Sequence, residues 1–226
     1  MLETKRKRTK HDTYKVSLEV TPMNQTQGDY LSALRSSNQV IAFGPAGTGK
    51  TYVVSSYAAS LYHTKEVNKI VITRPHIPVG RDIGYLPGSL EEKVYPWALP
   101  VLDVLEKHLG KGVVDTGIKN GNIEMAPLAL MRGRSFENSF VICDEAQNTT
   151  THELKMLTTR IGEGSTLVLN GDIQQSDLRQ DSGLAKVIHL VKKHMLPVPI
   201  IEFGIEDIVR SDICAMWSKV FFEEKI

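Results

Sequence analysis

The stretch Gly44-Pro45-Ala46-Gly47-Thr48-Gly49-Lys50-Thr51 decides how this chain is interpreted. It fits the pattern G-x-x-x-x-G-K-[ST], in which glycines let the backbone turn tightly and point its N–H groups at phosphates. The apolar run QVIAFG (39–44) precedes it and the helix-like TYVVSSYAASLY (51–62) follows it, so the motif has the context that it requires. We therefore expect a P-loop for a nucleoside triphosphate, with Lys50 on the β- and γ-phosphates and the Thr51 hydroxyl on Mg²⁺.

Further apolar, β-branched runs extend this pattern along the chain. Runs at 67–75, 139–143, 165–172 and 197–203 are typical of strands buried on both faces of a parallel sheet. The alternating segment YKVSLEV (14–20) predicts an additional edge strand.

Helices are predicted between these runs. Residues 28–34 indicate one helix, and apolar side chains recur at helical spacing through 98–109 and 184–191. Thr150 and Glu153 have capping-box spacing at the start of another helix, which Gly162 is expected to stop. Strands that alternate with helices predict an α/β fold, a mostly parallel sheet with helices on both faces.

Composition narrows the class of protein. The 226 residues carry 27 Lys and Arg against 26 Asp and Glu, and 41% are apolar, which suits one globular domain. We expect a basic, disordered tail over 1–12, which is either solvated or in contact with the phosphate backbone of a nucleic acid. A single domain is expected over 13–226. The chain shows neither a run long enough to span a membrane nor a secretory signal, so a cytoplasmic location is expected, in a bacterial cell or, for a phage protein, in its host.

A second motif, FVICDEAQ (140–147), places two adjacent carboxylates at the end of a predicted strand. In this context Asp144 is expected to hold Mg²⁺ as a Walker B residue, and Glu145 to orient and deprotonate the attacking water. A third run, VLNGDIQQSD (168–177), also ends a strand in polar residues. Carboxyl ends of parallel strands face one crevice, so these side chains are expected near the γ-phosphate.

These motifs together resemble the PhoH-like P-loop ATPases, whose domain is similar to the first RecA-like domain of superfamily 1 helicases. The resemblance rests on GPAGTGKT, TRP (73–75), GYLPGSLEEKVYPW (84–97), MRGRSFENSFVICDEAQN (131–148), TRIGEGS, GDIQQSDL and EDIVRSD. It covers about residues 20 to 216, and it implies a RecA-like P-loop NTPase that uses ATP and Mg²⁺.

The resemblance also implies roles for single residues. Gln27 resembles an adenine-reading glutamine, although a surface glutamine is the alternative. Gln175, last in GDxxQ, resembles a γ-phosphate sensor, although Gln174 stands where the family commonly has Thr. Arg210 resembles an arginine finger, with a plain surface arginine as the alternative. Arg74 resembles a residue that lies against single-stranded nucleic acid, or else it pairs with a carboxylate of the fold.

Other candidates for contact with nucleic acid are less specific. For Arg132 and Arg134 two interpretations stay open, contact with a phosphate backbone and a role in an interface. Tyr95 and Trp97 are candidates for base stacking or for core packing.

The expected activity is Mg²⁺-dependent ATP hydrolysis coupled to RNA or single-stranded DNA. Superfamily 1 helicases close their site with a second RecA-like domain, so a neighbouring subunit is expected here, in a homo-oligomer and plausibly a hexameric ring. Alternatives are a nucleotide-dependent binding module with slow turnover and a small-molecule phosphotransferase. The sequence leaves open whether RNA or DNA is preferred, whether the protein unwinds or translocates, and whether Arg210 acts on its own subunit.

Overall fold

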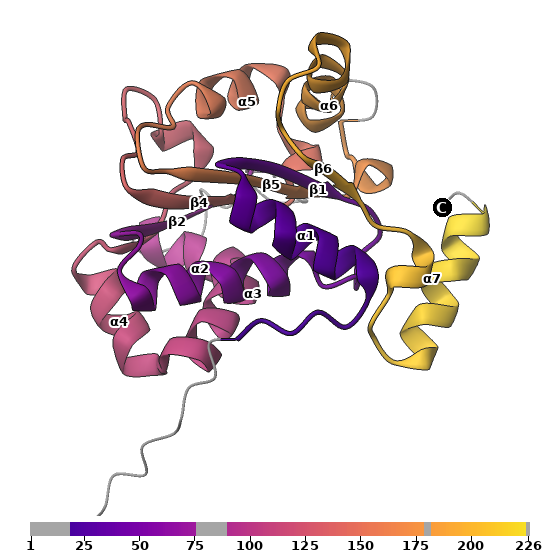
Figure 1. The fold of residues 1–226 in the computed structure, drawn as a ribbon, viewed down its shortest axis with the longest axis horizontal. Coiled ribbons are helices and arrows are strands. Elements are labelled where there is room, and N and C mark those ends of the chain that lie inside the picture. The colour runs from indigo at the N-terminus through magenta and orange to yellow at the C-terminus, as the bar shows by residue number, and fades with distance from the viewer. Residues whose placement is uncertain (1–18, 76–89, 179–181, 225–226) are drawn as a thin grey trace, which may run out of the picture.

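A computed structural model describes residues 19–75, 90–178 and 182–224 and shows a three-layer α/β arrangement (Figure 1). Six strands form one sheet in the order β3-β2-β4-β5-β1-β6, and every pair in it is parallel. The strands are β1 (Gln39–Phe43), β2 (Lys69–Thr73), β3 (Ile123–Met125), β4 (Ser139–Cys143), β5 (Thr166–Gly171) and β6 (Ile200–Glu202).

Helices connect the strands and cover both faces of the sheet (Figure 1). The α-helices are α1 (Gln25–Ser36), α2 (Lys50–Thr64), α3 (Leu90–Leu109), α4 (Lys111–Lys119), α5 (Thr151–Thr158), α6 (Gly183–His194) and α7 (Asp212–Glu224). Short 3₁₀ turns are η2 (Leu128–Leu130), η3 (Ala146–Asn148), η4 (Ile173–Gln175) and η6 (Ile205–Asp207). None of the helices in the described ranges is both long and apolar enough to cross a membrane.

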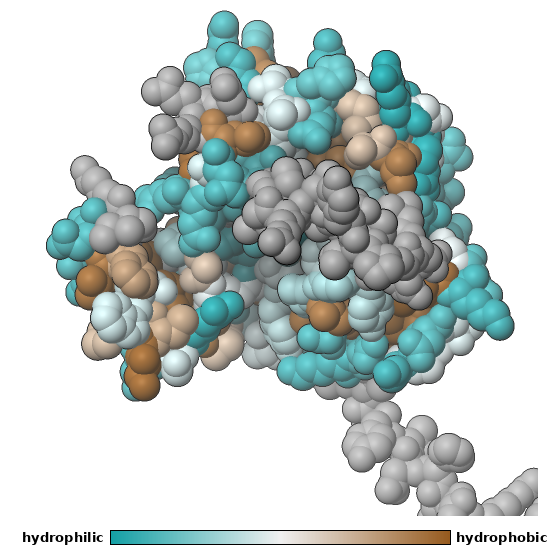
Figure 2. Space-filling model, turned by 180° about the vertical axis from the view of Figure 1, so that it is seen from behind, coloured by the Kyte–Doolittle hydropathy of each residue, from teal (hydrophilic) through white to brown (hydrophobic). Residues whose placement is uncertain are grey.

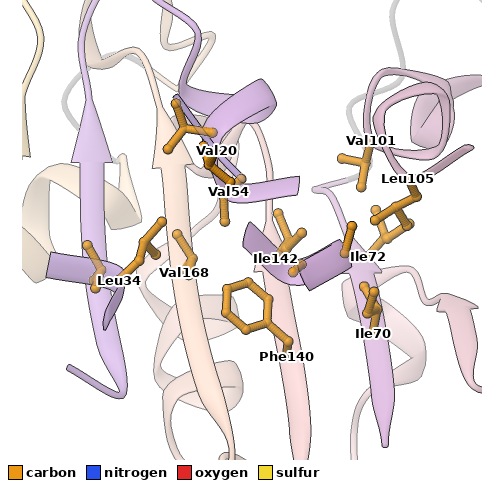
Figure 3. Packing of buried hydrophobic residues seen from close by; sticks show 14 of the residues in the cluster. Val20, Leu34, Val54, Ile70, Ile72, Val101, Leu105, Phe140, Ile142 and Val168 are labelled. Carbon is orange, nitrogen blue, oxygen red and sulfur yellow. The ribbon is translucent and has the colours of Figure 1, made fainter. Parts of the chain in front are cut away.

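The central strands are buried on both faces because a layer of helices packs on each. Phe140, Ile142 and Val168 meet side chains of α1, α2 and α3 on one face, where Val54 and Leu105 lie (Figure 3). The opposite face packs against α5 and α6 in a second apolar cluster. This double burial explains why the strands have near-continuous apolar sequences.

The predicted α/β fold, a mostly parallel sheet with helices on both faces, is confirmed. The runs at 39–44, 67–75, 139–143, 165–172 and 197–203 form β1, β2, β4, β5 and β6. Strand β3 and helices α4 and α7 were not among the predicted elements.

Two expectations concern segments that the structure describes only in part or not at all. The predicted strand over 14–20 lies mostly outside the described residues; of its last two residues neither is in a strand, and Val20 packs into the core. The expected tail over 1–12 lies outside the described residues altogether, so the division at residue 13 stays a prediction.

Helix α5 begins as predicted but ends differently. Thr150 and Glu153 form the capping box, with Glu153 N–H donating to Thr150 Oγ1 at 3.2 Å. The expected left-handed stop at Gly162 is wrong, since the helix ends at Thr158 and the left-handed glycine is Gly164. Close packing against the carbonyl of Phe136 accounts for a glycine at position 162 instead.

Candidate nucleotide site

The loop between β1 and α2 has the geometry of a phosphate-binding loop. Gly44 has a φ of 139°, and a Cβ there would overlap the carbonyl oxygen of Phe203, which leaves glycine as the residue that fits. Gly49 is left-handed at the start of α2, so the backbone turns directly from the loop into the helix. The first turn of a helix presents free N–H groups and a partial positive charge, which suits an anion.

Lys50 lies inside this loop. Its Nζ donates to the carbonyl oxygens of Gly44 at 2.7 Å and Pro45 at 2.8 Å, and to Thr48 Oγ1 at 3.1 Å. Burial lowers the pKa of Lys50, while the nearby carboxylates, Asp172 first among them, oppose that shift. The ammonium group is therefore held where the loop curls around it.

Thr51 and Asp144 supply two neighbouring oxygen donors. Thr51 Oγ1 donates to Asp144 Oδ1 at 3.2 Å, which links the start of α2 to the end of β4. Burial, reinforced by Glu145, raises the pKa of Asp144 to about 6. A hydroxyl and a carboxylate are hard ligands of the kind that Mg²⁺ prefers, and a bound cation would favour the ionised carboxylate. The donor set thus fits Mg²⁺.

Glu145 follows directly, in a left-handed conformation with a φ of 53°. Its Oε2 accepts from Gln147 Nε2 at 2.6 Å, and Arg74 Nη2 lies 3.8 Å from its Oε1. Backbone strain in a non-glycine residue is concentrated at functional sites. This carboxylate is therefore oriented from two sides, by Gln147 and by Arg74.

Gln147 is a site residue to which the sequence analysis gave no role. Its side chain is buried, and its Oε1 accepts from the backbone N–H of Asp172 at 3.0 Å. It thus joins the end of β4 to the end of β5. Its place in DEAQN was the available signal, but the partner Asp172 is 25 residues away.

The end of β5 contributes Asp172 and Gln175 to the same cavity. Burial raises the pKa of Asp172, although hydrogen bonds from the η4 backbone oppose the rise. The backbone N–H of Gln174 donates a hydrogen bond to Asp172 Oδ1 at 3.1 Å, which stabilises the start of η4.

Arg210 lies over the P-loop of its own chain. The backbone N–H of Val209 donates to Gly47 O at 3.0 Å, which ties the segment after η6 to the loop. A Cβ on Gly47 would lie 3.0 Å from Arg210 Cδ. One cavity of about 400 Å³ brings the candidate site residues together; its lining includes Lys50, Thr51, Arg74, Asp144, Glu145, Asp172, Gln175 and Arg210.

Gln27 braces the loop from the other side. It is buried, its Nε2 donates to Thr48 O at 2.9 Å, and its Oε1 accepts from Met23 N–H at 2.9 Å. The alternative of a surface glutamine is therefore wrong, whereas adenine reading stays a prediction.

The three candidate arginines for nucleic acid have different surroundings. Arg74 lines the nucleotide cavity beside Glu145. Arg134 forms a bidentate pair with Glu124, at 2.5 and 2.7 Å, beside the edge strand β3, and Arg132 is exposed. Of the two aromatic candidates, Trp97 packs against the core and Tyr95 is 40% exposed on α3.

Comparisons with known proteins agree with this geometry. A family described as PhoH-like protein matches residues 19–221. Protein PhoH of Escherichia coli (strain K12) is 43% identical over 195 residues, 84% of this chain and 55% of that protein. A PhoH-like protein of Bacillus subtilis (strain 168) is 40% identical over 205 residues, 88% of this chain and 62% of that protein. The chain therefore spans little more than half the length of these relatives.

Among solved structures, the DUF1998 helicase MrfA bound to DNA aligns with a TM-score of 0.49 and 9% identity, over 79% of this chain and 27% of that one. A similarity of that size carries no argument about function. The family of this chain is shown by its relatives in sequence, and its site is described from its own residues.

Proposed function

Since the chain belongs to the PhoH family, we propose that it binds ATP together with Mg²⁺ and hydrolyses the bond between the β- and γ-phosphates. Family membership and the parallel α/β fold identify a P-loop, ATPase-like protein. One observation supports hydrolysis in particular: Lys50, the Thr51–Asp144 pair, Glu145, Gln175 and Arg210 converge on a single cavity of about 400 Å³.

Each of these residues has a distinct part in the proposed reaction. Lys50 and the loop N–H groups would stabilise the negative charge of the phosphates. Thr51 and Asp144 would hold Mg²⁺, whose positive charge would stabilise the charge that builds up on the phosphates as ADP leaves. Glu145 orients the water and accepts its proton. Gln175 and Arg210 contact the γ-phosphate and stabilise the charge that develops there. Gln27, which contacts the loop at Thr48 O, is proposed to read the adenine.

Coupling to RNA or single-stranded DNA is a further part of the proposal. It is supported by the position of Arg74, which lies beside Glu145 at the end of β2. A polymer that draws Arg74 away would change the charge around the proposed base, so binding and hydrolysis would be linked. Arg132 and Arg134 belong to the same proposal, and Arg134 would first have to leave Glu124.

We also propose that the protein acts as a homo-oligomer, a hexameric ring, in the cytoplasm of a bacterium or of a phage's host. Cys143 and Cys214 are free thiols, as that reducing compartment favours. The arginine finger in the proposed site is Arg210 of the same chain, because it lies over its own P-loop.

Steady-state ATP hydrolysis, measured alone and with single-stranded RNA or DNA, tests this function. Replacing Glu145→Gln should lower kcat by roughly 10²- to 10⁴-fold while ATP binding persists, because the general base is lost. Glu163→Gln is the matched control, since Glu163 is exposed and lies outside the residues that line the cavity. Equal hydrolysis by the wild type and by Glu145→Gln would refute the role of Glu145 as the general base, and a wild type that does not hydrolyse ATP would refute the proposed activity.

The same assay separates the alternatives. Tight ATP binding with negligible hydrolysis at any polymer concentration would indicate a nucleotide-dependent switch. Transfer of labelled γ-phosphate to a nucleoside would indicate a phosphotransferase. Stimulation by one polymer, absent in Glu145→Gln, would identify the nucleic acid.

A further inference from the structure

Helix α7 presents its apolar side chains to solvent. Five of them recur at i, i+3, i+4, i+7 and i+8, and each is between 40% and 70% exposed. We call them the α7 stripe: Ile213, Met216, Trp217, Val220 and Phe221. The residues of α7 that are partly buried are small, Cys214, Ala215 and Ser218. A surface helix of a globular protein normally points its apolar stripe at the core, so this orientation is reversed.

The α7 stripe forms a continuous patch. The rings of Trp217 and Phe221 stack at a centroid distance of 5.6 Å. Helix α7 stands at the side of the molecule (Figure 1), and apolar side chains gather on that lobe when it is seen from behind (Figure 2). The exposed apolar area is on the order of 500 Å², as large as the patches that mark interaction sites. It is more than half of the roughly 800 Å² that each partner buries in a stable interface.

The chain itself carries a surface that complements this stripe. A groove of about 310 Å³ runs along the edge strand β3, and Leu130 beside it is 51% exposed. We call it the β3 groove. Six of its lining residues are apolar, Ile118, Ile123, Met125, Ala126, Pro127 and Leu130, and Gly121 and the Glu124–Arg134 ion pair complete the lining. An apolar helix face laid in a groove is a recurrent mode of recognition.

The stripe and the groove lie at opposite edges of the sheet. Strand β3 ends the sheet on one side, while α7 follows β6, which ends it on the other. When a surface lies at one edge and its complement at the other, two copies contact each other head to tail. Repetition of that contact closes the copies into a ring or extends them into a filament.

Charge also matches a second copy. Helix α7 carries Asp212, Glu223 and Glu224 against Lys219, and its last turn has no basic residue to balance the negative end of the helix dipole. The β3 groove lies next in sequence to Lys119 and Arg132, both exposed. Glu124 in the groove is already paired with Lys69 and Arg134, so the two exposed cations would attract the acidic end of a helix that lay there.

We propose that the α7 stripe of one copy docks into the β3 groove of a second copy. Helix α7 starts two residues after Arg210, so the docked helix and the nucleotide cavity share one segment. The proposal concerns an interface and stands whether or not the chain hydrolyses ATP.

Native mass measured by sedimentation tests the interface, with three matched variants. Trp217→Glu disables the stripe, Leu130→Glu disables the groove, and Met195→Glu is the control, because Met195 is 88% exposed and belongs to neither surface. We expect the wild type and Met195→Glu to self-associate and the other two variants to be monomers with unchanged circular dichroism and melting temperature.

Mixing the two monomeric variants gives the decisive result. Trp217→Glu keeps an intact groove and Leu130→Glu keeps an intact stripe, so a one-to-one dimer should form only in the mixture. A wild type that stays monomeric at its highest soluble concentration would overturn the proposal. So would self-association of either variant alone, or a mixture of two folded monomers that do not pair.

Discussion

The Gln147 carboxamide donates to the Glu145 carboxylate at 2.6 Å and accepts the backbone N–H of Asp172 at 3.0 Å. One side chain thus connects the proposed general base to the strand end that carries Gln175. A Cβ on Gly171 would lie 2.7 Å from Gln147 Oε1, so the glycine leaves room for this bridge. The bridge makes Gln147 a positioning residue whose effect should be visible in turnover more than in ATP binding.

Replacing Gln147→Ala should lower kcat about 10- to 100-fold and change KM for ATP little, since Glu145 would lose its donor. The unpaired N–H of Asp172 should also cost about 1–3 kcal/mol of stability. Steady-state kinetics and urea unfolding measure both effects. Gln25→Ala is the control, because Gln25 makes an exposed side-chain bond to Asp29. A Gln147→Ala enzyme with wild-type kcat would contradict this role.

Replacing Gly44→Ala should abolish ATP binding, because the new Cβ would overlap Phe203 O and the φ of 139° disfavours alanine. Gly110→Ala separates the two causes, since Gly110 has a φ of 84° with no atom within 4 Å of the added Cβ. The control should lose about 1–3 kcal/mol of stability and still bind ATP. Calorimetric titration and thermal unfolding would show this, and tight ATP binding by Gly44→Ala would argue against the close approach.

Replacing Arg210→Ala should lower kcat by roughly 10³-fold or more if the side chain stabilises the transferring phosphate. Because Arg210 lies over Gly47 of its own chain, mixing Arg210→Ala with Glu145→Gln should restore no activity. Recovery of activity in the mixture would mean that the arginine acts on a neighbouring subunit. The measurement is hydrolysis across a range of mixing ratios.

Stability should depend on acid pH through Glu124. Hydrogen bonds from Arg134, helped by Lys69, lower the pKa of Glu124 to about 2. A folded pKa below the unfolded one means that the stabilisation is complete above about pH 4.5 and is lost as pH falls toward 2. The carboxylate is partly solvated, so we expect about 1–2 kcal/mol at neutral pH.

Urea unfolding between pH 7 and pH 3 tests this expectation. The wild type should lose more stability across that interval than Glu124→Gln. Glu163→Gln, an exposed control, should keep the wild-type slope. Parallel curves for the wild type and Glu124→Gln would remove the ion pair as a source of stability.

Much of the fold was predictable because its signals are local. The P-loop lies between a strand and a helix that are contiguous with it, and five apolar runs became strands where the sequence predicted them. Strand β3 has only three residues, Ile123–Met125, too few to show a pattern, and it forms because β2 offers it an edge. Apolar residues recur at helical spacing in α7, but this spacing does not indicate which part of the molecule, if any, covers the apolar face of the helix.

The sequence by itself determined which residues are candidates for the proposed phosphate chemistry, since the spacing within G-x-x-x-x-G-K-T and the adjacency of Asp144 and Glu145 are covalent facts. Only the tertiary structure decided the partners of those residues. Arg74 pairs with Glu145, Arg134 pairs with Glu124, and Arg210 lies over Gly47, each across a separation in the chain that no local pattern encodes. The physical reason is that parallel strands bring the ends of distant segments to one edge, where charge and hydrogen-bond geometry select among the side chains that arrive.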